Sequence, residues 1–326
     1  MGYVSSQNVF LSSGTLTSKE NLPSQNVFNS FLLFHSHPFS LTLLLASLLL
    51  VSLFHITRSE ESPMHKEPPV FGFWHIGIVG SYMDVISDQL SQLQRACFLT
   101  DFTFIRLLST NATRTDVEWF IRTHPASEKL GTVLFTYGNE TEGHIADTST
   151  SWLVRKLTEY VTDDAIVWFM HNKGSTHGGK VDYENVGDWR RMMMYFLFEK
   201  DWCYRALRED FYDTCGSNMA YSITKHYSGT FWMAHARYVK TLPYASMFWS
   251  AEYHQPPRLA GEVWLLHSDL PSSRILCVHD SRKLLYFTSY PRSVYEQAVI
   301  GHGCEDRVKP EFLAALQGSV NETSTV

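Results

Sequence analysis

Two histidines and a lysine follow a short apolar segment in the middle of the chain. The apolar residues Ala165–Met170 run into a loop with His171, Lys173, His177, three glycines and two hydroxyl side chains. Lysine and backbone N–H groups in such a loop can hold a phosphate. The loop therefore predicts an anion site, and its candidate binding residues are His171, Lys173, Gly174, Ser175 and His177. A polar turn with an exposed lysine explains the same residues, because no phosphate motif of known spacing is present.

The apolar segment indicates which element positions this loop. Its length, branched residues and aromatic residues predict a fully buried strand. In open α/β sheets, ligands bind in the crevice outside the carboxyl ends of the strands. A candidate binding loop directly after Met170 would occupy that place.

Helical and strand patterns alternate along the first part of the chain. Strands are expected at 70–79, 102–107, 132–137 and 165–170, with helices at 81–97, 116–124 and 151–161. This alternation predicts an α/β fold with a mostly parallel sheet and helices on both faces. Further on, the pattern predicts a long helix over 189–209, beginning near Asp188 as its N-cap, and a short helix or strand over 261–266.

Composition limits the classes of function. The 326 residues are 44% hydrophobic and can bury a sizeable core, and the net charge of -6 argues against nucleic-acid binding. The five cysteines have no CxxC spacing, so a zinc module is not expected. In an oxidising compartment up to two disulfides could form, with Cys203–Cys215 and Cys277–Cys304 as the local pairings, but the sequence does not choose among the connectivities.

Composition also divides the chain into segments. Residues 1–38 are rich in polar residues and predict a disordered tail. The uncharged run Phe39–Ile56 would span about 27 Å as a helix, enough for the hydrocarbon core of a bilayer. We therefore expect a signal anchor at 39–57, a stem at 58–69, one α/β domain at 70–306 and a C-terminal tail at 307–326.

Three N-glycosylation sequons lie beyond the expected anchor, at Asn111, Asn139 and Asn321. Their position on one side of the anchor favours a lumenal domain. The sequence thus predicts a single-pass type II protein of the Golgi or endoplasmic reticulum membrane.

Several short segments resemble one group of enzymes. The segment His171–Ser175 is similar to a His-Thr-Lys-Lys/Gly-Ser signature that closes a buried strand in rhamnan-synthesis-F-like and related polysaccharide-synthesis glycosyltransferases. Other similar segments are Trp74–Ile76, Trp189–Arg191, His226–Trp232 and Ala260–Leu265. They occur in the same order and extend over residues 70 to 290.

The resemblance implies a GT-A-like fold that binds a nucleotide-sugar donor and transfers the sugar to a glycan acceptor. It adds Arg190, Tyr227, Ser228, Gly229 and Trp232 to the candidate substrate-binding residues. It also implies catalytic roles for Glu262 and His226, with Glu262 as the base that takes the acceptor proton. A glutamate near the start of a helix and a structural histidine are the plain alternatives for these two residues.

The chain departs from the family pattern at the metal site. Such enzymes often carry Asp-x-Asp after a central strand, whereas here the strand ends in His171-Asn-Lys173. Dependence on Mn²⁺ or Mg²⁺ therefore stays open and no metal ligand is assigned. A lysine and a histidine could themselves neutralise the leaving diphosphate.

Two other classes of function remain. A non-catalytic, lectin-like or scaffolding relative would keep the fold without the chemistry, and the missing acidic pair favours it. A hydrolase is a weaker alternative, because no G-x-S-x-G or H-E-x-x-H motif is present. The donor, the acceptor, the linkage and the anomeric outcome are not encoded in any recognisable motif.

Overall fold

The computed structural model describes residues 67–108, 111–138, 146–221, 225–245, 257–266 and 273–297. These residues all belong to one compact unit of the chain. The expected tail at 1–38, the anchor at 39–57, most of the stem and the C-terminal tail lie outside the described residues. Within the described ranges, no helix is both long enough and apolar enough to cross a membrane.

The first part of the domain alternates strands and helices as the sequence pattern predicts. Its elements are β1 (Val70–Gly77), α3 (Tyr82–Leu93), β2 (Phe102–Leu108), α4 (Asn111–Thr123), the 3-10 helix η2 (Pro125–Leu130), β3 (Thr132–Gly138), α5 (Ala146–Thr158) and β4 (Ile166–His171). Helices α4 and α5 begin earlier than expected, at Asn111 and Ala146. Their first turns are polar, so apolar periodicity gives no sign of where they start.

The second part is more fragmented. It contains α6 (Tyr183–Met194), the π-helical turn η5 (Tyr195–Glu199), α7 (Trp202–Arg208), β5 (Thr214–Gly216), β6 (Met219–Ala220), β7 (His226–Tyr227), β8 (Trp232–His235), α8 (Ala236–Thr241), α9 (Pro257–Val263), the 3-10 helix η8 (Trp264–Leu266), β9 (Ile275–Cys277) and α10 (Arg292–Tyr295). The expected short helix or strand at 261–266 is thus the end of α9 followed by η8.

The predicted single helix at 189–209 with an N-cap at Asp188 is wrong. Helix α6 already begins at Tyr183, and an extended residue, Lys200, separates η5 from α7. Asp188 lies inside α6, where its carboxylate accepts hydrogen bonds from Arg191 at 2.8 Å and from the hydroxyl of Ser289 at 2.7 Å. The first turn of α6 is mostly polar, so apolar periodicity does not mark its start. Asp188 resembles an N-cap, but such a residue can also occur within a helix.

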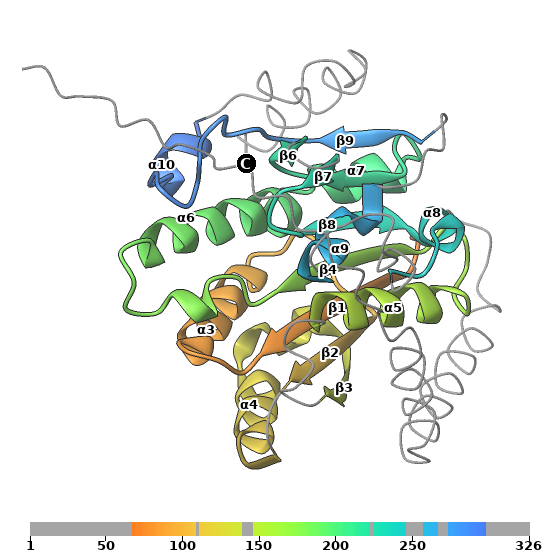
Figure 1. The fold of residues 1–326 in the computed structure, drawn as a ribbon. Coiled ribbons are helices and arrows are strands. Elements are labelled where there is room, and N and C mark those ends of the chain that lie inside the picture. The colour runs from red at the N-terminus through yellow and green to blue at the C-terminus, as the bar shows by residue number, and fades with distance from the viewer. Residues whose placement is uncertain are drawn as a thin grey trace, which may run out of the picture. The chain divides into compact units, whose positions relative to one another are not determined.

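Seven strands form one mixed, mostly parallel sheet in the order β3-β2-β1-β4-β8-β5-β9. Strand β8 is antiparallel to both of its neighbours, and the other pairs are parallel. The order can be followed upward from β3 in Figure 1. The strand predicted at Ala165–Met170 is confirmed as β4, in the interior of the sheet between β1 and β8.

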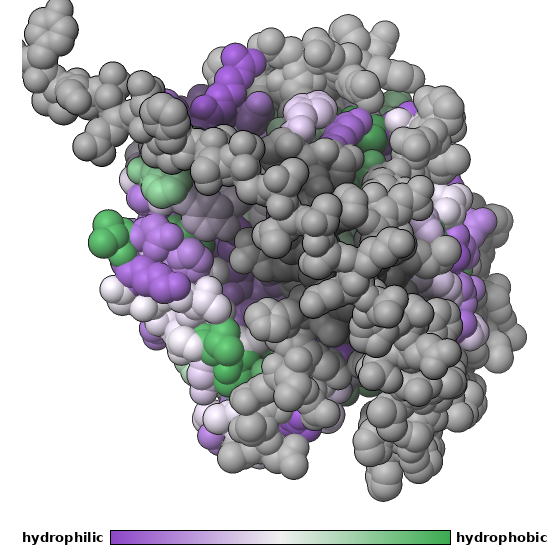
Figure 2. All heavy atoms as spheres, viewed as in Figure 1, coloured by the Kyte–Doolittle hydropathy of each residue, from purple (hydrophilic) through white to green (hydrophobic). Residues whose placement is uncertain are grey.

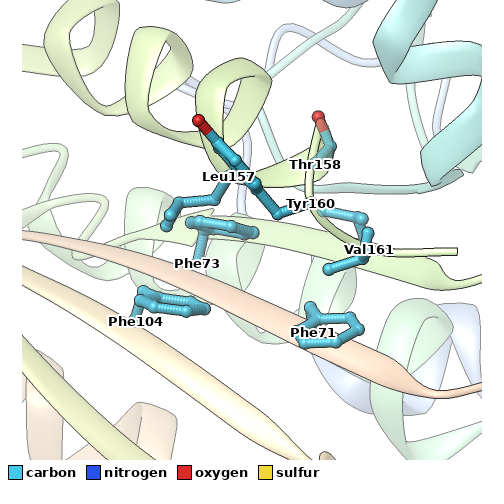
Figure 3. Close-up of a pocket in the computed structure, with 8 residues that line it drawn as sticks. Phe71, Phe73, Phe104, Leu157, Thr158, Tyr160 and Val161 are labelled. Atoms are coloured by element: carbon cyan, nitrogen blue, oxygen red, sulfur yellow. The ribbon is translucent and has the colours of Figure 1, made fainter. Parts of the chain in front are cut away.

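The two faces of the sheet are covered by different helices. On one face, alternate residues such as Trp74 and Met170 pack with Leu90 of α3 and Met192 of α6 in the main core. On the other face, aromatic side chains of β1 and β2 lie beneath α5, and Figure 3 shows Phe71, Phe73 and Phe104 below Leu157. We call these the α6 face and the α5 face.

One of the expected local cysteine pairings is present. Cys203 and Cys215 form a disulfide that links α7 to β5. Cys277 is also disulfide-bonded, and Cys304, its expected local partner, lies outside the described residues. Cys97 is free and exposed.

Candidate functional site

The strand order reverses next to β1. The chain moves outward from β1 through β2 to β3 and then returns to place β4 on the other side of β1. In doubly wound sheets, ligands bind outside the carboxyl ends of the two strands that flank such a reversal. These two ends lie at Gly77 and His171. We therefore take this carboxyl edge as the candidate site.

The antiparallel strand β8 brings a second segment to the same edge. Its first residue, Trp232, pairs with Phe169 near the carboxyl end of β4 and with Gly216 at the end of β5. The loop before β8 therefore ends close to where the loop after β4 begins. The segments His171–Gly179 and His226–Trp232, which are far apart in sequence, meet at one edge of the sheet.

The loops after β1 and β4 are tied together. The side chain of Asn172 accepts a hydrogen bond from Gly77 N at 3.0 Å and donates one to Gly77 O at 2.7 Å. Ser81 N donates to the carbonyl of the buried Ser175 at 2.9 Å. Gly80 lies so close that an added Cβ would be 2.2 Å from the Ser175 carbonyl oxygen, so the packing requires glycine there. The two loops form one connected unit.

Lys173 and His177 contact side chains of the protein itself. The Lys173 ammonium is 3.8 Å from the centre of the Trp189 ring and 5.3 Å from that of Tyr286. The His177 Nδ1 atom is 2.9 Å from the Asp182 carboxylate, and this contact lowers the pKa of Asp182. The cation–π contacts attach the β4 loop to α6 and to the chain around Tyr286.

Arg190 supports the same loop from α6. Its side chain is 4% exposed, and its Nε and Nη2 atoms donate to Asp88 of α3 at 3.0 and 2.7 Å. Its Nη1 atom donates to the Lys173 carbonyl at 2.7 Å. Gly174 adopts a φ of +95°, and a Cβ there would lie 3.1 Å from the Arg190 guanidinium. These contacts fix the loop backbone. The predicted role of Arg190 in binding substrate stays a prediction.

The segment before β8 is held mainly by core contacts. The Tyr227 hydroxyl lies 3.0 Å from Thr214 Oγ1 and donates to the Leu276 carbonyl at 2.8 Å, and burial raises the pKa of Tyr227 well above its usual range. Gly229 has a φ of +95°, and an added Cβ would lie 2.6 Å from the sulfur of Met193. Trp232 stacks on Phe169 at a centroid distance of 5.5 Å. Ser228 N donates to the Asn218 carbonyl at 2.8 Å.

The two candidate catalytic residues belong to adjoining elements. His226 is buried and pairs with Ala220 in the β6–β7 hairpin. Glu262 is half-buried on α9, which packs against β7 and α5. The contacts of Lys173 lie instead on α6, on the other face of the sheet. A cleft shared by Lys173 and Glu262 therefore stays a prediction.

No metal centre is evident in the part of the chain that the structure describes. There, no three His, Cys, Asp or Glu side chains are grouped closely enough to hold a metal ion. Asp182, which belongs to the nearest acidic pair after β4, contacts His177. The candidate site is thus defined by basic and aromatic residues.

A cleft of about 650 Å³ lies at the opposite edge of the sheet. It is lined by residues that precede β1 and β2, such as Val70 and Asp101, and by charged side chains of α7. Arg208 pairs with Glu67 at 3.2 Å across its wall. Because it lies at the amino ends of the parallel strands, we do not place the candidate site there.

Sequence reasoning missed one set of polar residues at the carboxyl edge. Thr136, Arg106 and His75 are aligned with His171 on four adjacent strands. We call these four residues the edge row. His171 was already a candidate from its loop. The only sign of the other three in the sequence is a basic or polar residue within an otherwise apolar strand, such as Arg106 in Phe102–Leu108.

Comparison with known proteins gives a family without a described activity. Residues 80–259 match the family described as "Domain of unknown function (DUF8361)". This match spans more than half of the chain, and the protein belongs to this family. No curated protein matches the chain.

Proposed function

We propose that this protein is a glycosyltransferase with a GT-A-like domain that transfers a sugar from a nucleotide-sugar donor to a glycan acceptor. The observation that carries the proposal is the meeting of two segments at the strand reversal. His171–Ser175 and His226–Trp232 resemble glycosyltransferase segments, and both reach the carboxyl edge, the first at the end of β4 beside β1 and the second at Trp232 beside β4. The order β3-β2-β1 is also that of one mononucleotide-binding half of a doubly wound sheet, and β4 lies on the other side of β1, as in the order 3-2-1-4 of such sheets.

The proposed chemistry is a displacement at the anomeric carbon of the donor sugar. A hydroxyl oxygen of the acceptor bonds to that carbon while the bond to the nucleoside diphosphate breaks. Glu262 takes the hydroxyl proton, and His226 lines the acceptor side from the neighbouring hairpin. Negative charge grows on the leaving diphosphate, so positive groups at the carboxyl edge stabilise the transition state. A divalent cation such as Mn²⁺ or Mg²⁺ remains compatible with this reaction.

The proposal includes a membrane location. The apolar run at 39–57 would anchor the chain, and the three sequons beyond it would place the domain in the lumen of the Golgi or endoplasmic reticulum. The Cys203–Cys215 disulfide supports this, because such bonds persist in oxidising compartments. In a secretory host, glycosidase treatment should increase the gel mobility of the protein. Unmodified Asn111, Asn139 and Asn321 would remove the main support for a lumenal domain.

A second candidate function is a non-catalytic relative that binds glycans or other proteins. The observation that favours it is the internal use of several candidate site residues. Lys173 lies over the Trp189 ring, Arg190 donates a hydrogen bond to Asp88, and the Tyr227 hydroxyl is hydrogen-bonded to that of Thr214. These contacts would persist in a protein that had lost the chemistry.

Donor screening separates the two functions. The purified full-length protein is incubated with a panel of nucleotide sugars and mixed glycan acceptors, with and without Mn²⁺. A product whose mass increases by one sugar residue supports the transferase. Donor binding without turnover for any acceptor, or no binding at all, favours the non-catalytic relative.

A further inference from the structure

The edge row places one polar side chain on each of four adjacent strands at the same level. Arg106 pairs with Thr136 on one side and with His75 on the other, and His75 pairs with His171. Residues paired in this way project to the same face of a sheet. That face is the α5 face, because Phe73 and Phe104, two residues before His75 and Arg106, lie beneath α5 in Figure 3. The surface next to α5 thus changes from aromatic to polar within one row.

Helix α5 is arranged to support this row. Thr150, in its amino-terminal half, has its Oγ1 atom 2.7 Å from His75 Nδ1. Leu157, near its carboxyl end, lies over the aromatic residues further from the edge. The helix therefore points its amino end, where the helix dipole is positive, toward the edge row.

Burial differs along the row. His75 is 4% exposed and is held by Thr150, whereas Arg106 and His171 on its two sides are half-buried. The Cα atoms of Arg106 and His171 are two strand spacings apart, about 10 Å. Both side chains project from the same face of the sheet, and an anion bound between them over His75 could contact both. Arginine is always charged, and its planar group matches the oxygens of a phosphate.

We propose that the edge row binds the diphosphate of the nucleotide donor, with Arg106 and His171 as the contacting residues and His75 as a positioning residue. The identity of the ligand rests on the proposed transferase function. The anion site would then lie at Arg106 and His171 and not at Lys173. The ammonium of Lys173 lies over the Trp189 and Tyr286 rings, whereas Arg106 and His171 belong to the face that α5 covers.

Calorimetric titration of the full-length protein tests this inference. The probes are the diphosphates of uridine, guanosine, cytidine and adenosine, together with inorganic pyrophosphate. Arg106→Gln and His171→Gln should each weaken binding by about tenfold to a hundredfold, since each removes a charged or polar contact to phosphate. Arg122→Gln is the matched control. It removes the same charge from α4, where Arg122 lies 4.8 Å from the Phe135 ring on the α6 face, and binding should not change.

The outcomes separate this inference from the transferase proposal. If wild type and both edge-row variants bind nucleoside diphosphates equally well, the edge row is not the diphosphate site, but the proposed transferase function stands. Binding of pyrophosphate alone, weakened by Arg106→Gln, keeps the edge row and overturns the nucleotide donor. No binding of any probe overturns both. If Arg106→Gln does not fold, Arg106→Lys keeps the charge but removes the planar guanidinium. Diphosphate affinity should then fall about tenfold.

Discussion

The two faces of the sheet use polar residues differently at the carboxyl edge. On the α6 face, Arg190 and Lys173 contact Asp88 and Trp189, and their effect is to hold the β4 loop in place. On the α5 face, His75 and Arg106 stand in line with His171 beside the amino end of α5. The comparison indicates that Lys173 and Arg190, which the sequence singled out, hold the loop in place. The proposed ligand site instead combines His171, which the sequence also singled out, with Arg106, which it did not.

The largest expected effect is on the α6 face, where Asp88 neutralises a buried arginine. Asp88→Ala should lower the free energy of unfolding by about 3 kcal/mol, because Arg190 would keep its charge in a buried site without its partner. Denaturant unfolding measures the change. Asp84→Ala removes the same charge from an exposed position in the first turn of α3 and should cost less than about 1 kcal/mol. Equal losses in the two variants would contradict a supporting role for Arg190.

The next prediction concerns chemistry on the α5 face. Glu262→Gln keeps the shape of the side chain but cannot accept a proton, so turnover should fall about a hundredfold or more. Donor affinity should change little, because the proposed role is proton transfer. Steady-state rates and donor titration give the two constants. Glu128→Gln, at an exposed position in η2, is the control, and equal turnover in both variants would exclude Glu262 as the base.

The sequence predicts the first part of the domain well, because its strands are apolar and regularly spaced. Residues 166–170 are all fully buried, and the apolar run before His171 showed this directly. The second part was harder to read. Strands β5 to β9 have two to four residues each, too few for an alternation to be recognised. The order in which β8 enters the sheet depends on long-range pairing that no local pattern records.

The candidate site was only partly predictable for a similar reason. The sequence indicated the carboxyl end of β4, but not that Arg190 would be enclosed by Asp88, a residue 102 positions away. It also did not reveal the edge row. His75 and Arg106 become neighbours only when β1 and β2 pair in the observed register. Sequence patterns thus located the edge, and the register decides which side chains share a face.

Two glycines of the β4 loop should respond differently to substitution. Both Gly174 and Gly179 have positive φ, but a Cβ on Gly174 would touch Val186 at 3.0 Å, whereas nothing lies within 4 Å of one on Gly179. Gly179→Ala should therefore cost about 1 kcal/mol from backbone strain alone, and Gly174→Ala about 2 kcal/mol or more. Denaturant unfolding compares the two variants. Equal costs would mean that the loop does not pack closely on α6.

Lys173 offers a direct choice between the two faces. If its contacts with Trp189 and Tyr286 define its role, Lys173→Met should lower the free energy of unfolding by about 1 kcal/mol and leave nucleoside diphosphate binding unchanged. Lys180→Met, in the exposed part of the same loop, should have almost no effect. Loss of about tenfold or more in diphosphate affinity for Lys173→Met would instead return the anion site to the β4 loop.

The smallest expected effect is at the amino end of β4, at the opposite edge of the sheet from the candidate site. There His235 pairs with Ile166, is 3% exposed, and lies 3.7 Å from Asp210. Burial lowers the pKa of His235, and nearby Arg237 acts in the same direction, while Asp210 and Asp213 oppose the shift. Between the lowered pKa and the unfolded value of about 6.5, the unfolded chain binds more protons at this residue.

The contribution of His235 to stability is therefore complete above about pH 6.5 and is lost as the pH falls toward the lowered pKa, with a slope of at most about 1.4 kcal/mol per pH unit. Asp210 and Asp213, whose pKa values are lowered by Arg237 and Arg274 despite burial, titrate in more acidic solution and do not contribute to this window.

Unfolding free energies of wild type and His235→Gln, measured from pH 8 to pH 5, should run parallel above pH 7. Below about pH 6.5 the wild-type curve should fall more steeply. Parallel curves throughout would show that His235 has the same pKa in the folded protein as in the unfolded chain. Burial at the amino end of β4 would then have no effect on the protonation of this histidine.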